Sequence, residues 1–133
     1  MAPDPSRDPD VLVVDAANVA GSRPDGWWRD RPGAAARLHT ELTGAGLGAV
    51  VLVLEGRARR GVPEGDRDGV RVVHAEGSGD DRVVEEVTAL VHNGRAVTVV
   101  TADRGLVARV TDLGAAVVGP CTLRDRLADP LSS

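Results

Sequence analysis

Acidic side chains follow three separate valine-rich segments of the chain. Asp15 ends the run VLVVD, Asp80 and Asp81 lie in GSGDD after a later run, and Asp103 lies in VVTADRG. Carboxylates that are brought close together repel one another unless a cation lies between them. Hard oxygen ligands of this kind suit Mg²⁺ or Mn²⁺. The pattern therefore predicts a divalent-metal site held by Asp15, Asp80 and Asp103.

Each acid also has a purely structural interpretation. Asp15 could be a turn residue at the end of a strand. Asp80 could cap the following helix, Asp81 could complement the dipole of that helix, and Asp103 could cap the next helix. Glu55 follows another apolar run and is interpreted as a solvated loop acid. The metal-site interpretation is favoured because Asp15, Asp80 and Asp103 follow three different predicted strands.

The elements that position these acids are indicated by hydrophobic patterning. Short valine-rich runs with little polar alternation are typical of strands buried on both faces of a parallel sheet. They cover Val11–Val14, Ala49–Leu54, Val70–Val73, Ala96–Val100 and Ala115–Val118. Helical spacing predicts helices over Pro32–Thr43, Asp81–His92, the Leu106–Leu113 stretch before Gly114, and Thr122–Leu127. The alternation predicts an α/β fold, a three-layer α/β/α sandwich around a five-stranded, mainly parallel sheet.

Two consequences follow from this topology. In an open parallel sheet, ligands bind at the carboxyl ends of the strands, so all of the acids are expected at one rim. The stretch Gly56–Gly69 has no helical period and is expected to be a long, arginine-rich loop.

Composition narrows the class of protein. The chain has 133 residues, which favours one domain, expected over residues 10–128 between a disordered tail (1–9) and a flexible end (129–133). A net charge of −4 argues against a passive nucleic-acid coat. All 16 basic residues are arginine, and the absence of lysine excludes Schiff-base catalysis and a Walker A phosphate loop.

With one cysteine and scattered histidines, a cysteine-rich zinc site is excluded. The longest aliphatic run is too short to span a bilayer, and the acidic, proline-rich start is no secretory signal, so we expect a cytoplasmic protein without membrane association.

The motifs DAANV, GSGDDRVVEEV and VVTADRGL, in this order, resemble the NYN/YacP-like branch of the PIN-domain ribonucleases over about residues 10 to 128. The resemblance implies a PIN-like sandwich and a metal-dependent ribonuclease, an endoribonuclease using Mg²⁺ or Mn²⁺ on an RNA substrate. It implies that Asp15, Asp80 and Asp103 bind the metal. By analogy with PIN-like domains, it also suggests a homodimer.

The same resemblance implies further site residues. Asn18 stands at the orienting asparagine of the family, Asp81 at its accessory acid, and Thr101 at a small hydroxyl residue of the motif. The chain departs from the family pattern in its acidic net charge and its long arginine-rich stretch.

Arginine and tryptophan side chains are candidates for holding the substrate. Arg104 adjoins Asp103, and Arg23 follows the first motif; guanidinium groups bind phosphate bidentately. Trp27 and Trp28 are the only aromatic residues. A tryptophan can stack on a base or pack against a helix, and we expect one of each, with Trp27 assigned to the substrate.

Two other functions remain open at this point. The same acids and arginines suit a magnesium-dependent nucleotide (NTP) pyrophosphohydrolase. A catalytically inactive RNA-binding module with the same fold is the third interpretation. Product analysis distinguishes the two enzymes, since one yields shortened RNA and the other a nucleoside monophosphate with pyrophosphate.

Overall fold

A computed structural model describes residues 10–23 and 26–128. The segments 1–9 and 129–133, for which disorder and flexibility are predicted, lie outside the described residues. Within the described part of the chain, no helix is both long and apolar enough to cross a membrane.

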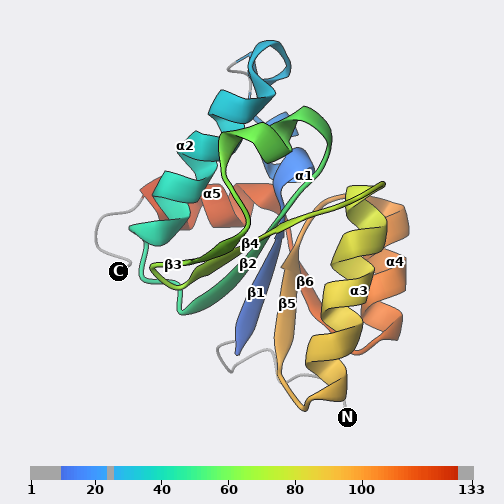
Figure 1. Cartoon of the computed structure of the whole chain (residues 1–133). Helices are drawn as coiled ribbons and strands as arrows, with labels where there is room; N and C mark the ends of the chain where they lie inside the picture. The colour runs from blue at the N-terminus through green and yellow to red at the C-terminus, as the bar shows by residue number, and fades with distance from the viewer. Residues whose placement is uncertain (1–9, 24–25, 129–133) are drawn as a thin grey trace.

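The centre of the fold is one six-stranded sheet in the order β3-β4-β2-β1-β5-β6 (Figure 1). The pairs β1·β2, β1·β5, β2·β4 and β5·β6 are parallel, and only β3 runs antiparallel to its neighbour β4. The predicted α/β sandwich with a mainly parallel sheet is confirmed, but the predicted count of five strands is one too low. The strands are β1 (Val11–Asp15), β2 (Ala49–Leu54), β3 (Gly65–Arg67), β4 (Val70–His74), β5 (Val97–Val100) and β6 (Ala116–Val118).

The additional strand comes from the stretch that was predicted to be a loop. Its first part forms a 3-10 helix, η2 (Gly56–Gly61), and its last part forms β3. β3 turns into β4 through Asp68 and Gly69, which have φ values of 54° and 84°. Two successive positive φ values are the mark of a type I′ hairpin turn, for which Asp-Gly is a favoured pair. The loop prediction was wrong because it weighed helical period alone and passed over this turn signal.

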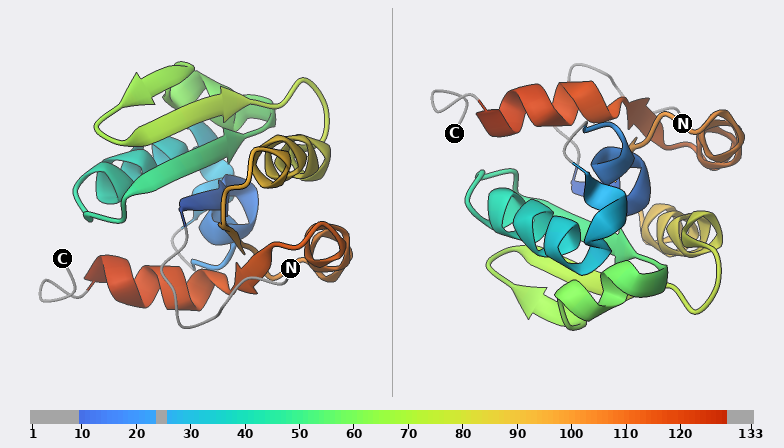
Figure 2. Two further views of the ribbon diagram at one scale, coloured as in Figure 1. Left: turned by 90° about the horizontal axis from the view of Figure 1, so that it is seen from below. Right: turned by 90° about the horizontal axis from the view of Figure 1, so that it is seen from above.

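Helices cover both faces of the sheet, as the views along it show (Figure 2). The described elements are α1 (Ala16–Gly21), the 3-10 helix η1 (Trp27–Arg29), α2 (Arg31–Thr43), α3 (Gly79–His92), α4 (Arg104–Asp112) and α5 (Pro120–Ala128). The four predicted helices are confirmed to within a few residues, whereas α1 and η1 were not predicted. α1 is only 6 residues long, too short to show a helical period in the sequence.

The two faces of the sheet carry separate apolar cores. Leu52 and Leu54 of β2 pack on the side of α1, α2 and α5, and Val51 and Val53 of the same strand pack on the side of α3 and α4. Successive side chains of a strand point to opposite faces, so a strand covered on both sides must be apolar throughout. This is the physical reason for the unbroken AVVLVL run.

η2 packs against the first turn of α2 at a point where only glycine fits. A Cβ atom on Gly61 would lie 2.1 Å from the carbonyl oxygen of Pro32. The obstacle is backbone, which cannot rotate away. The contact therefore joins η2 to the start of α2.

We expect Gly61→Ala to destabilise the protein by about 1 to 3 kcal/mol, because η2 and α2 must separate to admit the methyl group. The urea midpoint of unfolding measures this change. Gly77→Ala is the matched control, since a Cβ at Gly77 would meet nothing within 4 Å. Its midpoint should stay within about 1 kcal/mol of the unsubstituted protein. Equal midpoints for the two variants would contradict the close approach.

Candidate active site

The strand order reverses between β1 and β5, and we use the term crevice for the region where the carboxyl ends of these two strands part. From β1 the chain first builds β2 and β4 on one side, and then returns to the other side of β1 with β5 and β6. In open α/β sheets, ligands bind where the strand order reverses in this way. Asp15 is the last residue of β1, and Thr101 follows β5 directly.

Hydrogen bonds join the two sides of this crevice. The Thr101 hydroxyl donates to Oδ2 of Asp15 at 3.1 Å, and the Asp103 backbone N–H donates to the Thr101 hydroxyl oxygen at 3.2 Å. The Ala102 backbone N–H donates to Oδ1 of Asn18 at 2.8 Å. Asp15 also accepts from the Asn18 backbone N–H at 3.4 Å, as the N-cap of α1. The residues of the two motifs DAANV and VVTADRG therefore form one connected group.

Asp15 is a buried carboxyl group, with 5% of the residue exposed. Burial raises its pKa from 3.8 to about 6, against the lowering effect of the hydrogen bonds from Thr101 and Asn18. The nearby carboxylates Asp80 and Glu55 raise the pKa further. A carboxylate that is buried among other acids is costly in the charged form, and a bound cation would remove that cost.

Glu55, which the sequence interpretation treated as a solvated loop acid, is partly buried in the structure. It follows β2, and its Oε2 accepts a hydrogen bond from the backbone N–H of Gly79 at 2.8 Å. A Cβ on Gly79 would lie 3.0 Å from the carboxyl carbon of Glu55, so the glycine allows this close approach. Glu55 thereby joins the end of β2 to the start of α3. The position of Glu55 directly after a strand that adjoins β1 was the sequence signal that could have assigned it to the acidic group.

Asp80 lies in the first turn of α3 and faces the same acids. Its pKa is raised by burial, and then by the charges of Asp103 and Glu55, against the lowering effect of Arg109. Ser78 caps α3, its hydroxyl oxygen accepting from the backbone N–H of Asp81 at 3.3 Å. The alternative in which Asp80 caps the helix is therefore wrong, and its carboxylate is not used in that way.

The other two acids have partners of their own. Asp103 caps α4, and its Oδ1 accepts from the Leu106 backbone N–H at 2.9 Å. The capping alternative is thus confirmed for Asp103, whose charge also raises the pKa of Asp80. Asp81 is exposed and forms an ion pair with Arg109 at 3.1 Å. Asp81 therefore joins α3 to α4, and its role as an accessory acid stays a prediction.

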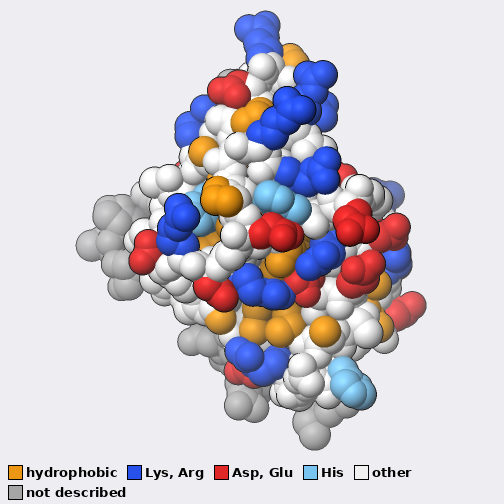
Figure 3. Space-filling view, viewed as in Figure 1, with side chains coloured by type: hydrophobic (Ala, Val, Ile, Leu, Met, Phe, Trp, Pro, Cys, Tyr) orange, Lys and Arg blue, Asp and Glu red, His pale blue; other side chains and the backbone are white. Residues whose placement is uncertain are grey.

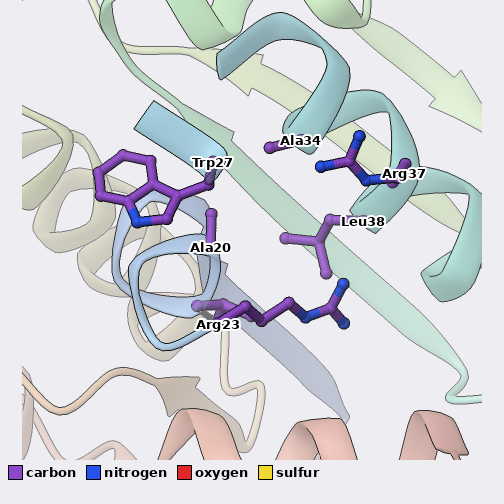
Figure 4. Close-up of a pocket in the computed structure, with 7 residues that line it drawn as sticks. Ala20, Arg23, Trp27, Ala34, Arg37 and Leu38 are labelled. Carbon is purple, nitrogen blue, oxygen red and sulfur yellow. The ribbon is translucent and has the colours of Figure 1, made fainter. Parts of the chain in front are cut away.

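Among the candidates for holding the substrate, Thr101 contacts Asp15 and Arg104 adjoins Asp103 in the sequence, whereas Arg23 and Trp27 lie elsewhere. Arg104 is the exposed first residue of α4, next to Asp103. Arg23 forms a bidentate ion pair with Glu41 of α2, at 2.7 and 2.9 Å. Arg23 and Trp27 line a small pocket between α1, η1 and α2 that none of the acids enters (Figure 4).

The tryptophan expectation is confirmed in one respect. Trp27 is half-buried beside α1, and Trp28 is 55% exposed. One ring is therefore packed and the other is open to solvent, and the exposed ring is not the one that the sequence interpretation assigned to the substrate.

A divalent cation requires oxygen donors that lie close together. Within the residues that the structure describes, no group of three or more His, Cys, Asp or Glu side chains is arranged so that it could hold a metal ion. Mg²⁺ is typically held by one or two carboxylates together with water and substrate oxygens, so a set of three protein ligands is not required. The carboxylates of Asp15, Glu55, Asp80 and Asp103 are hard oxygen donors whose mutual repulsion a cation would relieve. In chemistry and charge they fit a hard divalent cation.

The fold and the site together define a three-layer α/β sandwich with a carboxylate-rich crevice at its topological switch point. The chain has a YacP-like fold. It is similar to Rae1 (YacP) from Bacillus subtilis with a TM-score of 0.73 and 19% identity, over 89% of this chain and 73% of that chain. For a tryptophan-to-leucine mutant of the same protein, the TM-score is 0.67 and the identity 17%, over 89% and 74% of the two chains. No family model matches the chain, and no curated protein matches it in sequence.

Proposed function

We propose that this protein is a metal-dependent ribonuclease that hydrolyses phosphodiester bonds of RNA. The observation that carries the proposal is the group of carboxylates at the switch point, in which Asp15 is buried with a pKa of about 6. Asp15, Glu55 and Asp103 each accept a hydrogen bond from a backbone N–H, but these bonds do not require the acids to lie near one another, and burying a charged carboxylate costs stability. Strongly shifted pKa values are concentrated at functional sites. The YacP-like fold supports the same reaction class by analogy.

Asp15, Asp80 and Asp103 would hold the cation, with Glu55 beside them. A divalent cation, when bound by these residues, would supply a water of lowered pKa and would neutralise charge that develops on the phosphate. Thr101 keeps the Asp15 carboxylate oriented through its 3.1 Å hydrogen bond. Its hydroxyl group thus links the orientation of Asp15 to the start of the loop that carries Asp103.

Two side chains are proposed to bind the scissile phosphate. The Oδ1 of Asn18 is used by the Ala102 N–H, which leaves the side-chain NH₂ group of Asn18 as the donor to a phosphate oxygen. Arg104 begins α4, and its guanidinium is exposed. The positive end of the α4 dipole adds to the attraction for phosphate there.

The test is an activity assay on the purified 133-residue chain. We expect labelled single-stranded RNA to be shortened in the presence of Mn²⁺ or Mg²⁺, and to remain intact in EDTA. Nucleoside triphosphates under the same conditions should yield no pyrophosphate. Release of pyrophosphate without shortening of RNA would replace this proposal with the pyrophosphohydrolase, and RNA cleavage that persists in EDTA would exclude the metal.

A further inference from the structure

Beside the acidic crevice lies a surface of exposed arginines around one exposed aromatic ring. We call it the arginine ridge and define it as Trp28, Arg29, Arg31, Arg57 and Arg60, all of which are exposed. In the space-filling view, arginine side chains gather over the upper part of the molecule, around η1, η2 and the start of α2 (Figure 3). Acidic side chains gather beside and below them.

The ridge is one continuous surface although its residues come from two parts of the sequence. The close approach of Gly61 to the Pro32 carbonyl brings η2 against the start of α2. Arg59 anchors the other end of η2, since its guanidinium donates to the carbonyl oxygens of Gly56 at 3.0 Å and Ala75 at 3.4 Å. The arginines on either side of this contact are therefore held at a stable spacing.

The charges of the ridge are available to a ligand. None of its four arginines forms an ion pair within residues 10–23 and 26–128. The neighbouring acid Asp30 is occupied as the cap of α2, where it accepts from the Gly33 backbone N–H at 2.9 Å. In a chain with a net charge of −4, unpaired cations gathered on one face indicate a polyanionic ligand.

The aromatic ring narrows the class of polyanion. Trp28 is 55% exposed, and the described residues hold no other large hydrophobic side chain so open to solvent. The edge of one indole meets the face of the other in the Trp27–Trp28 pair, with centroids 6.3 Å apart, and the guanidinium of Arg29 lies 5.8 Å from the Trp28 ring centroid. An aromatic ring among arginines is typical of single-strand recognition, in which bases stack on the ring and guanidinium groups bind the phosphates.

The ridge begins where the acidic group ends. η2 starts at Gly56, directly after Glu55, so Arg57 lies two residues from an acid of the crevice. We propose that the arginine ridge binds single-stranded RNA and leads the strand to the acidic crevice; this inference rests on the ribonuclease proposed above. The arginines supply affinity for phosphates at a distance from the scissile bond, and Trp28 stacks on an unpaired base.

The test measures binding apart from cleavage. The probe is a fluorescein-labelled single-stranded RNA of about 12 nucleotides, titrated in EDTA and followed by fluorescence anisotropy over a series of salt concentrations. We expect Arg57→Gln with Arg60→Gln to raise Kd about tenfold or more. Each arginine that contacts a phosphate makes the slope of log K against log salt steeper by about 0.7. The slope measured for the double variant should therefore be shallower by about 1.4 than that of the unsubstituted protein.

Trp28→Ala separates stacking from charge. We expect it to raise Kd about 5- to 100-fold and to leave the salt slope unchanged. Arg67→Gln with Arg95→Gln is the matched control, because it removes two charges outside the ridge. Arg95 forms a loose ion pair with Asp10 at 3.7 Å and donates to the Asp10 carbonyl oxygen at 3.4 Å. The control should leave both Kd and slope near those of the unsubstituted protein.

Several outcomes would contradict the proposal that the arginine ridge binds single-stranded RNA. These are equal Kd values for the ridge and control variants, equal affinity for duplex and single-stranded RNA, or binding of phosphatidylserine vesicles in preference to RNA. The proposal for the arginine ridge and the proposal of ribonuclease activity can be contradicted independently of each other. RNA binding that depends on the ridge, without any cleavage in Mn²⁺, contradicts the ribonuclease alone. Cleavage with a KM that the ridge variants leave unchanged contradicts the ridge alone.

Discussion

Asp15→Asn is expected to abolish cation-dependent cleavage of RNA and, at neutral pH, to make the protein more stable. The loss of activity follows because Asn lacks the negative charge that a divalent cation requires. Asn has nearly the same shape as Asp, and its one acceptor oxygen can keep the hydrogen bond from either Thr101 or the Asn18 N–H, so the fold should be retained with the loss of one hydrogen bond. We expect a fall in cleavage rate of at least about 100-fold, since general acid–base and metal functions contribute effects of that size.

The gain in stability follows from the raised pKa. Asp15 has a pKa of about 6 in the folded protein and an ordinary value of 3.8. The folded state therefore binds the proton more tightly, and stability falls as the pH rises from 3.8 through 6. Above pH 6 the charged Asp15 carboxylate lowers the free energy of unfolding by up to about 3 kcal/mol. The Asn variant has no charge at this position and avoids that loss. The advantage of the variant should be largest near pH 7.5 and should fade as the pH approaches 4.

Thermal unfolding at several pH values, with and without Mn²⁺, measures this prediction. Mn²⁺ should raise the melting temperature of the unsubstituted protein and leave that of the Asn variant unchanged, because a cation that binds only the folded state stabilises it. Asp112→Asn removes an exposed acid from the end of α4 and serves as the control, with no change in activity or in the response to Mn²⁺. Full activity of Asp15→Asn would remove the basis of the proposed site.

The second large effect is expected at Glu55, which sequence interpretation treated as a solvated loop acid. Glu55→Gln keeps an oxygen that can accept from the Gly79 backbone N–H, so the start of α3 should stay in place. The substitution removes a charge that raises the pKa of both Asp15 and Asp80. We expect kcat/KM to fall about 10- to 100-fold, the usual cost of disturbing the surroundings of a metal site, with weaker affinity for Mn²⁺.

Measurement at several Mn²⁺ concentrations distinguishes this effect from simple unfolding. High Mn²⁺ should restore part of the lost activity if Glu55 supports cation binding. Glu64→Gln is the matched control: it alters an acid that accepts from the His74 backbone N–H at 2.7 Å, on an exposed loop away from the crevice. If Glu55→Gln is as active as the control, Glu55 only holds the start of α3 and does not support cation binding.

Sequence alone determined the parts of this protein that depend on local pattern. Valine-rich runs predict doubly covered strands because both faces of each strand must be apolar. The acids that follow the runs were assigned to one rim because parallel strands end on the same side of a sheet. The hairpin at Asp68 and Gly69 was within reach of the same reasoning, since its turn is encoded by two adjacent residues.

Only the tertiary structure decided which polar groups meet. Helix spacing and side-chain direction decide that Ser78 rather than Asp80 caps α3. They also decide the ion pairs of Asp81 with Arg109 and of Arg23 with Glu41. The approach of Glu55 to Gly79 and of Gly61 to Pro32 joins residues that are far apart in the sequence. Such contacts are set by how whole elements pack, and no periodicity of the chain records them.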